Sequence, residues 1–163
     1  MESYMNRISN TGIVPVVKIL EKEDAYPLAK ALLNGGIDVI EVTYRSEHAT
    51  SAIQTISEQL PDMLVGAGTV LSVEQAKEAV EAGAKFIITP GFNTKVVQWC
   101  LDHDVEVYPG VSTASEVEMA LSMGLTQLKF FPAESSGGAK KLKDLSAPYA
   151  NVHFMPTGGI NTK

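Results

Sequence analysis

The sequence predicts an α/β fold of the (β/α)8 TIM-type barrel class, with about seven of the eight βα strands present in the chain. Short apolar runs alternate with amphipathic stretches, which is typical of parallel βαβ units. The apolar runs start about 19–27 residues apart, close to the combined length of one strand and one helix. No glycine-rich dinucleotide fingerprint follows the first run, so an open doubly wound sheet is the weaker alternative.

The strands are predicted from apolar runs that end in turn residues or in polar positions. Most of them are almost continuously hydrophobic, which favours strands buried on both faces. The runs are 12–19, 39–43, 64–68, 86–90, 105–109, 127–131 and 152–156.

The helices are predicted from apolar spacing and from residues that start or stop a helix. Ser72 is a capping residue before the third helix, and Gly83 and Gly124 are helix stops. The helices cover 24–34, 47–59, 73–82, 94–102 and 115–123, with a weaker one at 139–145.

The length and composition fit a single barrel domain over residues 1–163. With 163 residues and 45% apolar content, the chain can bury one sizeable core. The last βα unit is missing, because roughly 40–50 more residues would complete a barrel at this spacing. We therefore expect a fragment that is truncated at its C-terminus, with unpaired edges on its first and seventh strands.

Charge and hydropathy limit the classes of partner. The net charge is −6 and no basic stripe occurs, which argues against nucleic acid as a partner. Residues 1–12 are polar and resemble no signal peptide, and no apolar run is long enough to span a membrane. We expect no membrane association and a cytoplasmic location. The single cysteine, Cys100, lies in a helix-like apolar stretch and is expected to be a core residue rather than a reactive thiol.

Lys129 lies inside the apolar run 127–131. Burial disfavours the charged form of an amine, and a neutral amine attacks carbonyl carbon, as Schiff-base catalysis requires. The alternative is a lysine whose side chain extends from a strand end to solvent.

Further polar residues follow the predicted strands, where barrel enzymes place their chemistry. Glu41 ends an apolar stretch and suits a proton shuttle, although a structural ion pair with Lys129 or Arg45 would also explain it. Arg45 can hold a carboxylate or a phosphate with its planar guanidinium, or it can simply be a solvated residue at a helix start. Thr69 offers a hydroxyl beside glycines that allow close approach.

Gly158 and Gly159 follow the seventh strand and precede an expected helix. Free backbone N–H groups at that place form an anion site, and barrels often bind phosphate there. Three histidines show no metal-ligand spacing, so no metal is expected; they are His48, His103 and His153.

Together these segments resemble the 2-keto-3-deoxy-6-phosphogluconate (KDPG) / 4-hydroxy-2-oxoglutarate (KHG) aldolase family. The resemblance covers almost the whole chain, and its most specific parts are the lysine segment and the Glu-Val-Thr-x-Arg segment. The matching stretches are 14–17, 35–37, 41–45, 65–70, 89–91, 109–113, 129–134 and 156–160.

The resemblance implies a class I aldolase that splits KDPG into pyruvate and glyceraldehyde 3-phosphate, and KHG into pyruvate and glyoxylate. It implies that Lys129 forms the Schiff base and that Glu41 moves protons. It implies no external cofactor, a phosphorylated 2-keto-3-deoxy sugar acid or pyruvate as the small-molecule ligand, and a homotrimer. The implied substrate-binding residues are Arg45, Thr69, Pro90, Phe131, Gly158, Gly159 and Lys18.

Two other functions remain open from the sequence. Without its last unit the chain could be a phosphate-binding barrel fragment with no turnover. It could also be a phosphosugar isomerase or epimerase on the same fold, which would need acid–base residues but no buried strand lysine.

Overall fold

A computed structural model describes residues 4–161 as a series of parallel strands and helices in two compact units. The first unit holds the residues up to Ile88 together with Lys95–Val107. The second unit holds Thr89–Thr94 and the residues from Tyr108 onward. The predicted single domain over residues 1–163 stays a prediction.

The first unit is built on a five-stranded sheet in the order β1-β2-β3-β4-β5. The pairs β1–β2, β2–β3 and β3–β4 are parallel, with Val39 opposite Leu64 and Thr43 opposite Gly68. Every residue of β2 and β3 is buried, as expected of strands covered on both faces. The strands are β1 (Val16–Val17), β2 (Val39–Thr43), β3 (Leu64–Gly68), β4 (Phe86–Ile88) and β5 (Glu106–Tyr108).

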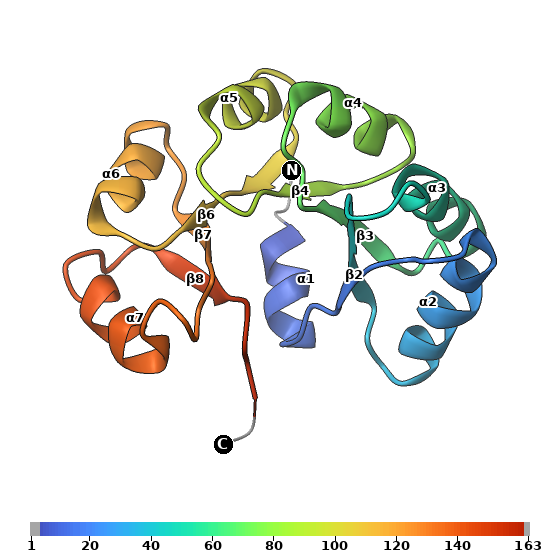
Figure 1. The fold of residues 1–163 in the computed structure, drawn as a ribbon, viewed down its shortest axis with the longest axis horizontal. Coiled ribbons are helices and arrows are strands. Elements are labelled where there is room, and N and C mark those ends of the chain that lie inside the picture. The colour runs from blue at the N-terminus through green and yellow to red at the C-terminus, as the bar shows by residue number, and fades with distance from the viewer. Residues whose placement is uncertain (1–3, 162–163) are drawn as a thin grey trace. The chain divides into compact units, whose positions relative to one another are not determined.

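Helices flank the strands of this unit, as Figure 1 shows for α2 to α4 beside β2 and β3. They turn alanines and branched side chains toward the sheet, including Ala29, Ile53 and Ala76. Ser72 caps α4 by accepting a hydrogen bond from the Gln75 N–H at 3.2 Å, as predicted. The helices are α2 (Ala25–Asn34) after a short 3-10 turn η1 (Lys22–Asp24), α3 (Ala49–Gln59), α4 (Val73–Glu81) and α5 (Thr94–Asp102).

One helix, α1 (Tyr4–Thr11), was not predicted from the sequence. The first predicted strand also begins too early, because Gly12 is the residue that ends this helix. Gly12 has φ +76°, in the left-handed region of backbone conformation, and its N–H donates to the Ile8 carbonyl at 2.9 Å. A glycine in this conformation commonly ends an α-helix. Only Val16 and Val17 of the run 12–19 pair with β2.

The second unit contains a three-stranded parallel sheet in the order β6-β7-β8, with two helices beside it (Figure 1). Its apolar core includes Val117, Leu128 and Phe130. The elements are β6 (Gly110–Val111), α6 (Ala114–Ser122), β7 (Gln127–Phe130), α7 (Gly138–Ser146) and β8 (His153–Pro156).

The predicted strand 105–109 corresponds to β5, and a second short strand that was not predicted, β6, follows it. Pro109 separates them, and it has no N–H with which to continue a ladder. Its carbonyl still accepts a hydrogen bond from the Lys129 N–H at 3.0 Å. Pro109 therefore interrupts the strand while helping to position the lysine strand.

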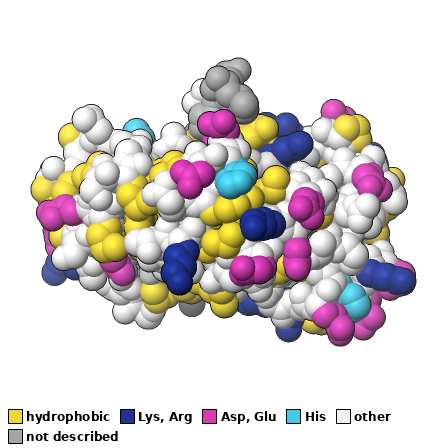
Figure 2. All heavy atoms as spheres, turned by 90° about the horizontal axis from the view of Figure 1, so that it is seen from above, with side chains coloured by type: hydrophobic (Ala, Val, Ile, Leu, Met, Phe, Trp, Pro, Cys, Tyr) yellow, Lys and Arg dark blue, Asp and Glu magenta, His cyan; other side chains and the backbone are white. Residues whose placement is uncertain are grey.

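The surface carries charges of both signs. On the face drawn in Figure 2, acidic and basic side chains are interspersed with neutral and hydrophobic ones, and no basic patch is seen there. Within residues 4–161, no helix is both long enough and apolar enough to cross a membrane.

Candidate functional site

Two buried polar side chains, Glu41 and Thr43, lie at the carboxyl end of β2. Glu41 is 1% exposed and Thr43 is fully buried. They are two residues apart in a strand, so they point to the same face of the sheet, while Val42 points to the other. Residues opposite them on β3 are Gly66 and Gly68, which add no side chain. The sheet thus leaves room on this face for a buried carboxylate.

The hydroxyl of Thr43 links β1 to the residue that follows β2. It donates a hydrogen bond to the Val17 carbonyl at 2.8 Å and accepts one from Nε of Arg45 at 3.2 Å. Arg45 is exposed, and so is Lys18, which follows Val17 directly. Thr43 therefore holds the Arg45 guanidinium close to the end of β2 and leaves its outer nitrogens available to an anion.

Thr69 follows β3 in an uncommon backbone conformation. Its φ is +55°, in the left-handed region that residues other than glycine rarely adopt. The preceding carbonyl, of Gly68, accepts a hydrogen bond from the Tyr44 N–H at 2.8 Å. This bond ties the start of the β2–α3 loop to the end of β3, so Arg45 and Thr69 belong to adjacent loops.

In the second unit, Lys129 is 4% exposed and lies in the middle strand of the sheet. Gly110 of β6 and Met155 of β8 are its partners across the ladder. Its Nζ lies over the ring of Phe131, 5.2 Å from the ring centroid, a cation–π distance. The alternative of a lysine reaching out to solvent is thus wrong, because the side chain is buried.

Pro90 lies against Gly110 of β6, the strand that pairs with the strand of Lys129. A Cβ added at Gly110 would come within 2.1 Å of the Pro90 carbonyl oxygen, so only glycine allows this approach. Gly110 in turn pairs with Lys129. The predicted pocket residue Pro90 therefore lies one strand away from the lysine.

Gly158 and Gly159 form the turn after β8, with φ values of +99° and +77°. The turn is fixed to the segment after β7, because Ala133 N–H donates to the Thr157 carbonyl at 2.8 Å and Glu134 N–H to the Gly158 carbonyl at 3.0 Å. Neither glycine N–H donates a backbone hydrogen bond within residues 4–161. A Cβ at Gly158 would lie 3.4 Å from Cε2 of Phe131, which brings this turn next to the ring beside Lys129.

The predicted site residues thus fall into two groups. The first unit brings together Lys18, Glu41, Arg45 and Thr69, and the second brings together Pro90, Lys129, Phe131, Gly158 and Gly159. Sequence reasoning assigned no role to Thr43 or Gly68. For Thr43, the only signal in the sequence was a threonine in an apolar strand two residues before Arg45. For Gly68, no signal was available, because its role depends on the register between β2 and β3.

The described residues contain no cluster of three His, Cys, Asp or Glu side chains that could hold a metal ion. His103 instead stacks on Trp99, with ring centroids 4.5 Å apart. Cys100 is fully buried and free, and burial raises the pKa of its thiol to about 12. The prediction of a core cysteine is confirmed.

Comparison with known families decides the class of the protein. A sequence model described as KDPG and KHG aldolase matches residues 4–163. The chain belongs to the KDPG and KHG aldolase family. Its membership confirms the resemblance and agrees with the predicted TIM-type fold.

Relatives in this family match over almost the whole chain. The 2-dehydro-3-deoxy-phosphogluconate aldolase of Treponema pallidum is 47% identical over 161 residues, covering 99% of this chain and 77% of that protein. The KHG/KDPG aldolase of Escherichia coli K12 is 44% identical over 94% of this chain and 73% of its own length.

Solved aldolase structures share the fold. A KDPG aldolase from Legionella pneumophila, with pyruvate captured at low pH as a covalent carbinolamine intermediate, has a TM-score of 0.89 and 44% identity, covering 91% of this chain and 72% of that one. The Zymomonas mobilis ZM4 aldolase, with 3-phosphoglycerate, has a TM-score of 0.90 and 38% identity over 96% of this chain and 77% of that one.

Proposed function

We propose that this chain is a Schiff-base aldolase that cleaves KDPG to pyruvate and glyceraldehyde 3-phosphate, and KHG to pyruvate and glyoxylate. The observation that carries the proposal is a lysine, Lys129, buried in the middle strand of a sheet in a member of this aldolase family. The covalent pyruvate carbinolamine of the Legionella pneumophila relative supports the same chemistry.

Lys129 is the proposed nucleophile. Its Nζ adds to the C2 carbonyl carbon of the substrate to give a carbinolamine, which loses water to give an iminium ion. The C4 hydroxyl then loses its proton, the C3–C4 bond breaks, and its electron pair moves toward the iminium, which releases the aldehyde and leaves an enamine. Protonation at C3 and hydrolysis of the resulting iminium release pyruvate and regenerate the lysine. The iminium is the electron sink, so no external cofactor is needed.

Glu41 is the proposed proton shuttle. It moves protons, through a water, during carbinolamine formation and during cleavage of the C3–C4 bond. Its burial at a strand end supports this role, because a carboxylate in such an environment can be placed with little freedom to move.

Substrate binding is assigned to residues of both groups. Arg45, Thr69 and Lys18 would hold the carboxylate end of the substrate, and Pro90 and Phe131 would shape the pocket. Gly158 and Gly159 would bind the phosphate through their backbone N–H groups. Their positive φ values support this role, as does the lack of a backbone acceptor for either N–H among residues 4–161.

We also propose a cytoplasmic homotrimer. The trimer rests on the resemblance to the family, whose members are typically homotrimers, and sedimentation equilibrium of the purified protein tests it. The location rests on the polar stretch 1–12 and on the lack of a long apolar run in the sequence.

The test is mass spectrometry after incubation with pyruvate and borohydride. The expected result is one reduced pyruvate adduct on the peptide that contains Lys129, absent in Lys129→Ala and retained in Lys140→Ala, a control at an exposed lysine of α7. An adduct on another lysine would refute the site assignment. Full cleavage activity in Lys129→Arg would refute the Schiff-base mechanism and favour acid–base chemistry on the same fold.

A further inference from the structure

We propose that Gly68 is a positioning residue for Glu41: the bare Cα of Gly68 is what allows the carboxylate to occupy its place at the end of β2. The inference rests on the proposed function, in which that carboxylate transfers protons. It adds to the mechanism a residue that bears no functional group.

The observation is a close approach between two neighbouring strands. A Cβ built at residue 68 would lie 1.9 Å from Oε1 of Glu41 and 2.5 Å from both its Cδ and its Cγ. Real Cβ atoms essentially never approach another heavy atom within 3.0 Å. The Glu41 side chain therefore lies directly against the backbone of Gly68, in the volume that a side chain would fill.

Backbone conformation does not explain this glycine. Gly68 is the last residue of β3, paired with Thr43 in a regular parallel ladder, and its φ is not among the positive values of the chain. Any residue can adopt such a strand conformation. Space for Glu41 is the reason that remains.

If a methyl group is added at residue 68, the carboxylate has to move rather than the strand. The Gly68 backbone is held by the ladder to β2 and by the Tyr44 N–H bond to its carbonyl. The Glu41 side chain can change its χ angles without breaking any backbone hydrogen bond of the ladder, so it is the partner that is displaced. To restore contact distance, the carboxylate oxygen must shift by more than about 1 Å, a displacement that can cost on the order of 100-fold in rate.

Gly66, two residues earlier on the same face of β3, provides a contrast. A Cβ there would lie 2.0 Å from a ring carbon of Phe86, a fully buried side chain. A rigid ring in a packed core cannot move aside as a carboxylate can. Gly66→Ala should therefore lower stability through overpacking, whereas Gly68→Ala should lower activity in a folded protein.

The experiment compares Gly68→Ala with Gly35→Ala, a control at the C-terminal end of α2 where an added Cβ makes contacts of 3.4 and 3.5 Å. We expect kcat for KDPG cleavage to fall by about 100-fold in Gly68→Ala and to stay within about threefold in Gly35→Ala. Retention of full kcat in folded Gly68→Ala would overturn the inference.

A double-mutant cycle separates positioning from a general structural effect. In a Glu41→Gln background, where the carboxylate is already absent, Gly68→Ala should reduce the remaining rate by less than about threefold. A further loss near 100-fold in that background would mean that Gly68 acts through something other than Glu41.

If Gly68→Ala fails to fold, the second variant decides the question. The atoms in conflict lie beyond Cβ of Glu41, so Glu41→Ala combined with Gly68→Ala should recover the melting temperature of Glu41→Ala. A double variant that also fails to fold would refute the inference. Failure of the proposed function can be told apart from failure of this inference. If the proposed function is wrong, wild-type protein forms no Lys129 adduct with pyruvate, and the inference about Gly68 is then refuted as well.

Discussion

The Nζ of Lys129 lies over the ring of Phe131, 5.2 Å from its centroid, with the lysine almost completely buried. An aromatic face carries partial negative charge and attracts a cation held above it. The proposed Schiff base is such a cation, since its iminium nitrogen is the lysine Nζ itself. In the proposed mechanism, Phe131 would therefore stabilise the intermediate as well as shape the pocket.

Replacing the ring should weaken formation of the intermediate. A partly desolvated cation–π contact contributes about 1–2 kcal/mol, so Phe131→Leu should lower kcat by roughly 5- to 30-fold. Phe131→Tyr keeps an aromatic face and should stay within about threefold of wild type. Borohydride trapping of pyruvate measures formation of the intermediate, and steady-state kinetics measure kcat. Equal losses in both variants would contradict a cation–π role, because Tyr keeps the aromatic face that Leu lacks.

Removing the Thr43 hydroxyl should affect substrate binding through Arg45. Thr43→Val keeps the side-chain shape but removes the acceptor for Arg45 Nε and the donor for the Val17 carbonyl. Loss of a hydrogen bond to a charged group costs about 1.5–3 kcal/mol, so kcat/KM should fall by roughly 10- to 160-fold, mainly through KM. Thr43→Ser keeps the hydroxyl and should restore most of the activity. A lower melting temperature with unchanged KM would show a structural role alone.

The sequence was sufficient to locate the strands that carry the site because their burial leaves a continuous apolar pattern. The runs 39–43 and 64–68 match β2 and β3 residue for residue, and Lys129 was identified as a charge within such a run. The family motifs then associated Glu41 and Arg45 with it.

Features that depend on contacts between distant residues were not predicted. Helix α1 is eight residues long and mostly polar, with Ile8 as its only buried residue, so its apolar pattern is too short to indicate a helix. The approach of Glu41 to Gly68 and the link from Thr43 to Val17 depend on the register between strands, which a single sequence does not reveal.

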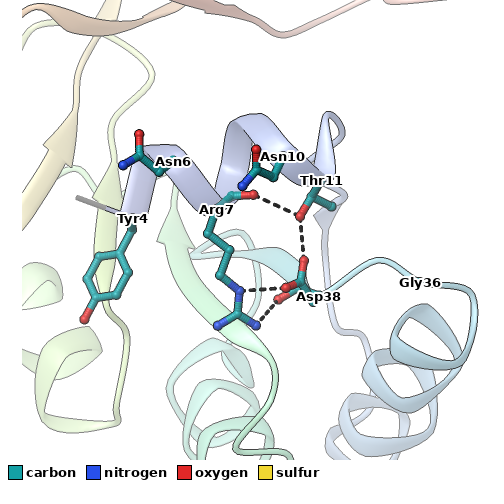
Figure 3. A pocket seen from close by; sticks show the side chains of 7 residues that line it. All are labelled: Tyr4, Asn6, Arg7, Asn10, Thr11, Gly36 and Asp38. Atoms are coloured by element: carbon teal, nitrogen blue, oxygen red, sulfur yellow. Dashed lines mark hydrogen bonds and ion pairs between the residues drawn. The ribbon is translucent and has the colours of Figure 1, made fainter. Parts of the chain in front are cut away.

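Helix α1 is attached to the sheet of the first unit through Asp38, just before β2. Figure 3 shows the Arg7 and Thr11 side chains meeting at this carboxylate, with Arg7 Nε at 2.7 Å and Thr11 Oγ1 at 2.5 Å. Arg7 also donates to the Asp38 and Asp62 carbonyls. Arg7, Thr11 and Asp38 line an open pocket of about 560 Å³. Asp38 precedes β2, so this pocket lies at the opposite end of β2 from Thr43 and Arg45 and belongs to the attachment of α1.

This attachment should make stability depend on pH. Partial burial tends to raise the pKa of Asp38, but the hydrogen bonds from Thr11 and Arg7 and the charge of Arg7 outweigh it, so the pKa is lowered from 3.8. A lowered pKa stabilises the fold above the unfolded-state value, and the contribution is lost as pH falls through the folded-state pKa. Since the pair is 38% exposed on both sides and screened by solvent, Asp38→Asn should cost only about 0.5–1 kcal/mol at pH 7.

Urea unfolding of wild type and Asp38→Asn between pH 7 and pH 3 measures this effect. The gap between the two proteins should shrink toward zero at the acid end. Glu23→Gln is the matched control, because its ion pair with Lys22 at 3.8 Å is about two-thirds exposed on both sides and its removal should change stability by less than about 0.5 kcal/mol. A gap that persists unchanged at pH 3 would contradict an ionic attachment.

Cys100 should be unreactive until the first unit unfolds. Its side chain is fully buried on α5 beside Val96 and Val97, and burial raises the pKa of the thiol to about 12, so the reactive thiolate is almost absent at neutral pH. A thiol reagent such as Ellman's reagent should therefore label the native protein at pH 8 at least about 100-fold more slowly than protein in 6 M guanidinium. Cys100→Ser, which has no thiol, gives the background rate. Because this is the chain's one cysteine, the labelling rate directly reports opening around α5, and fast labelling of native protein would mean that this helix opens far more often than its burial implies.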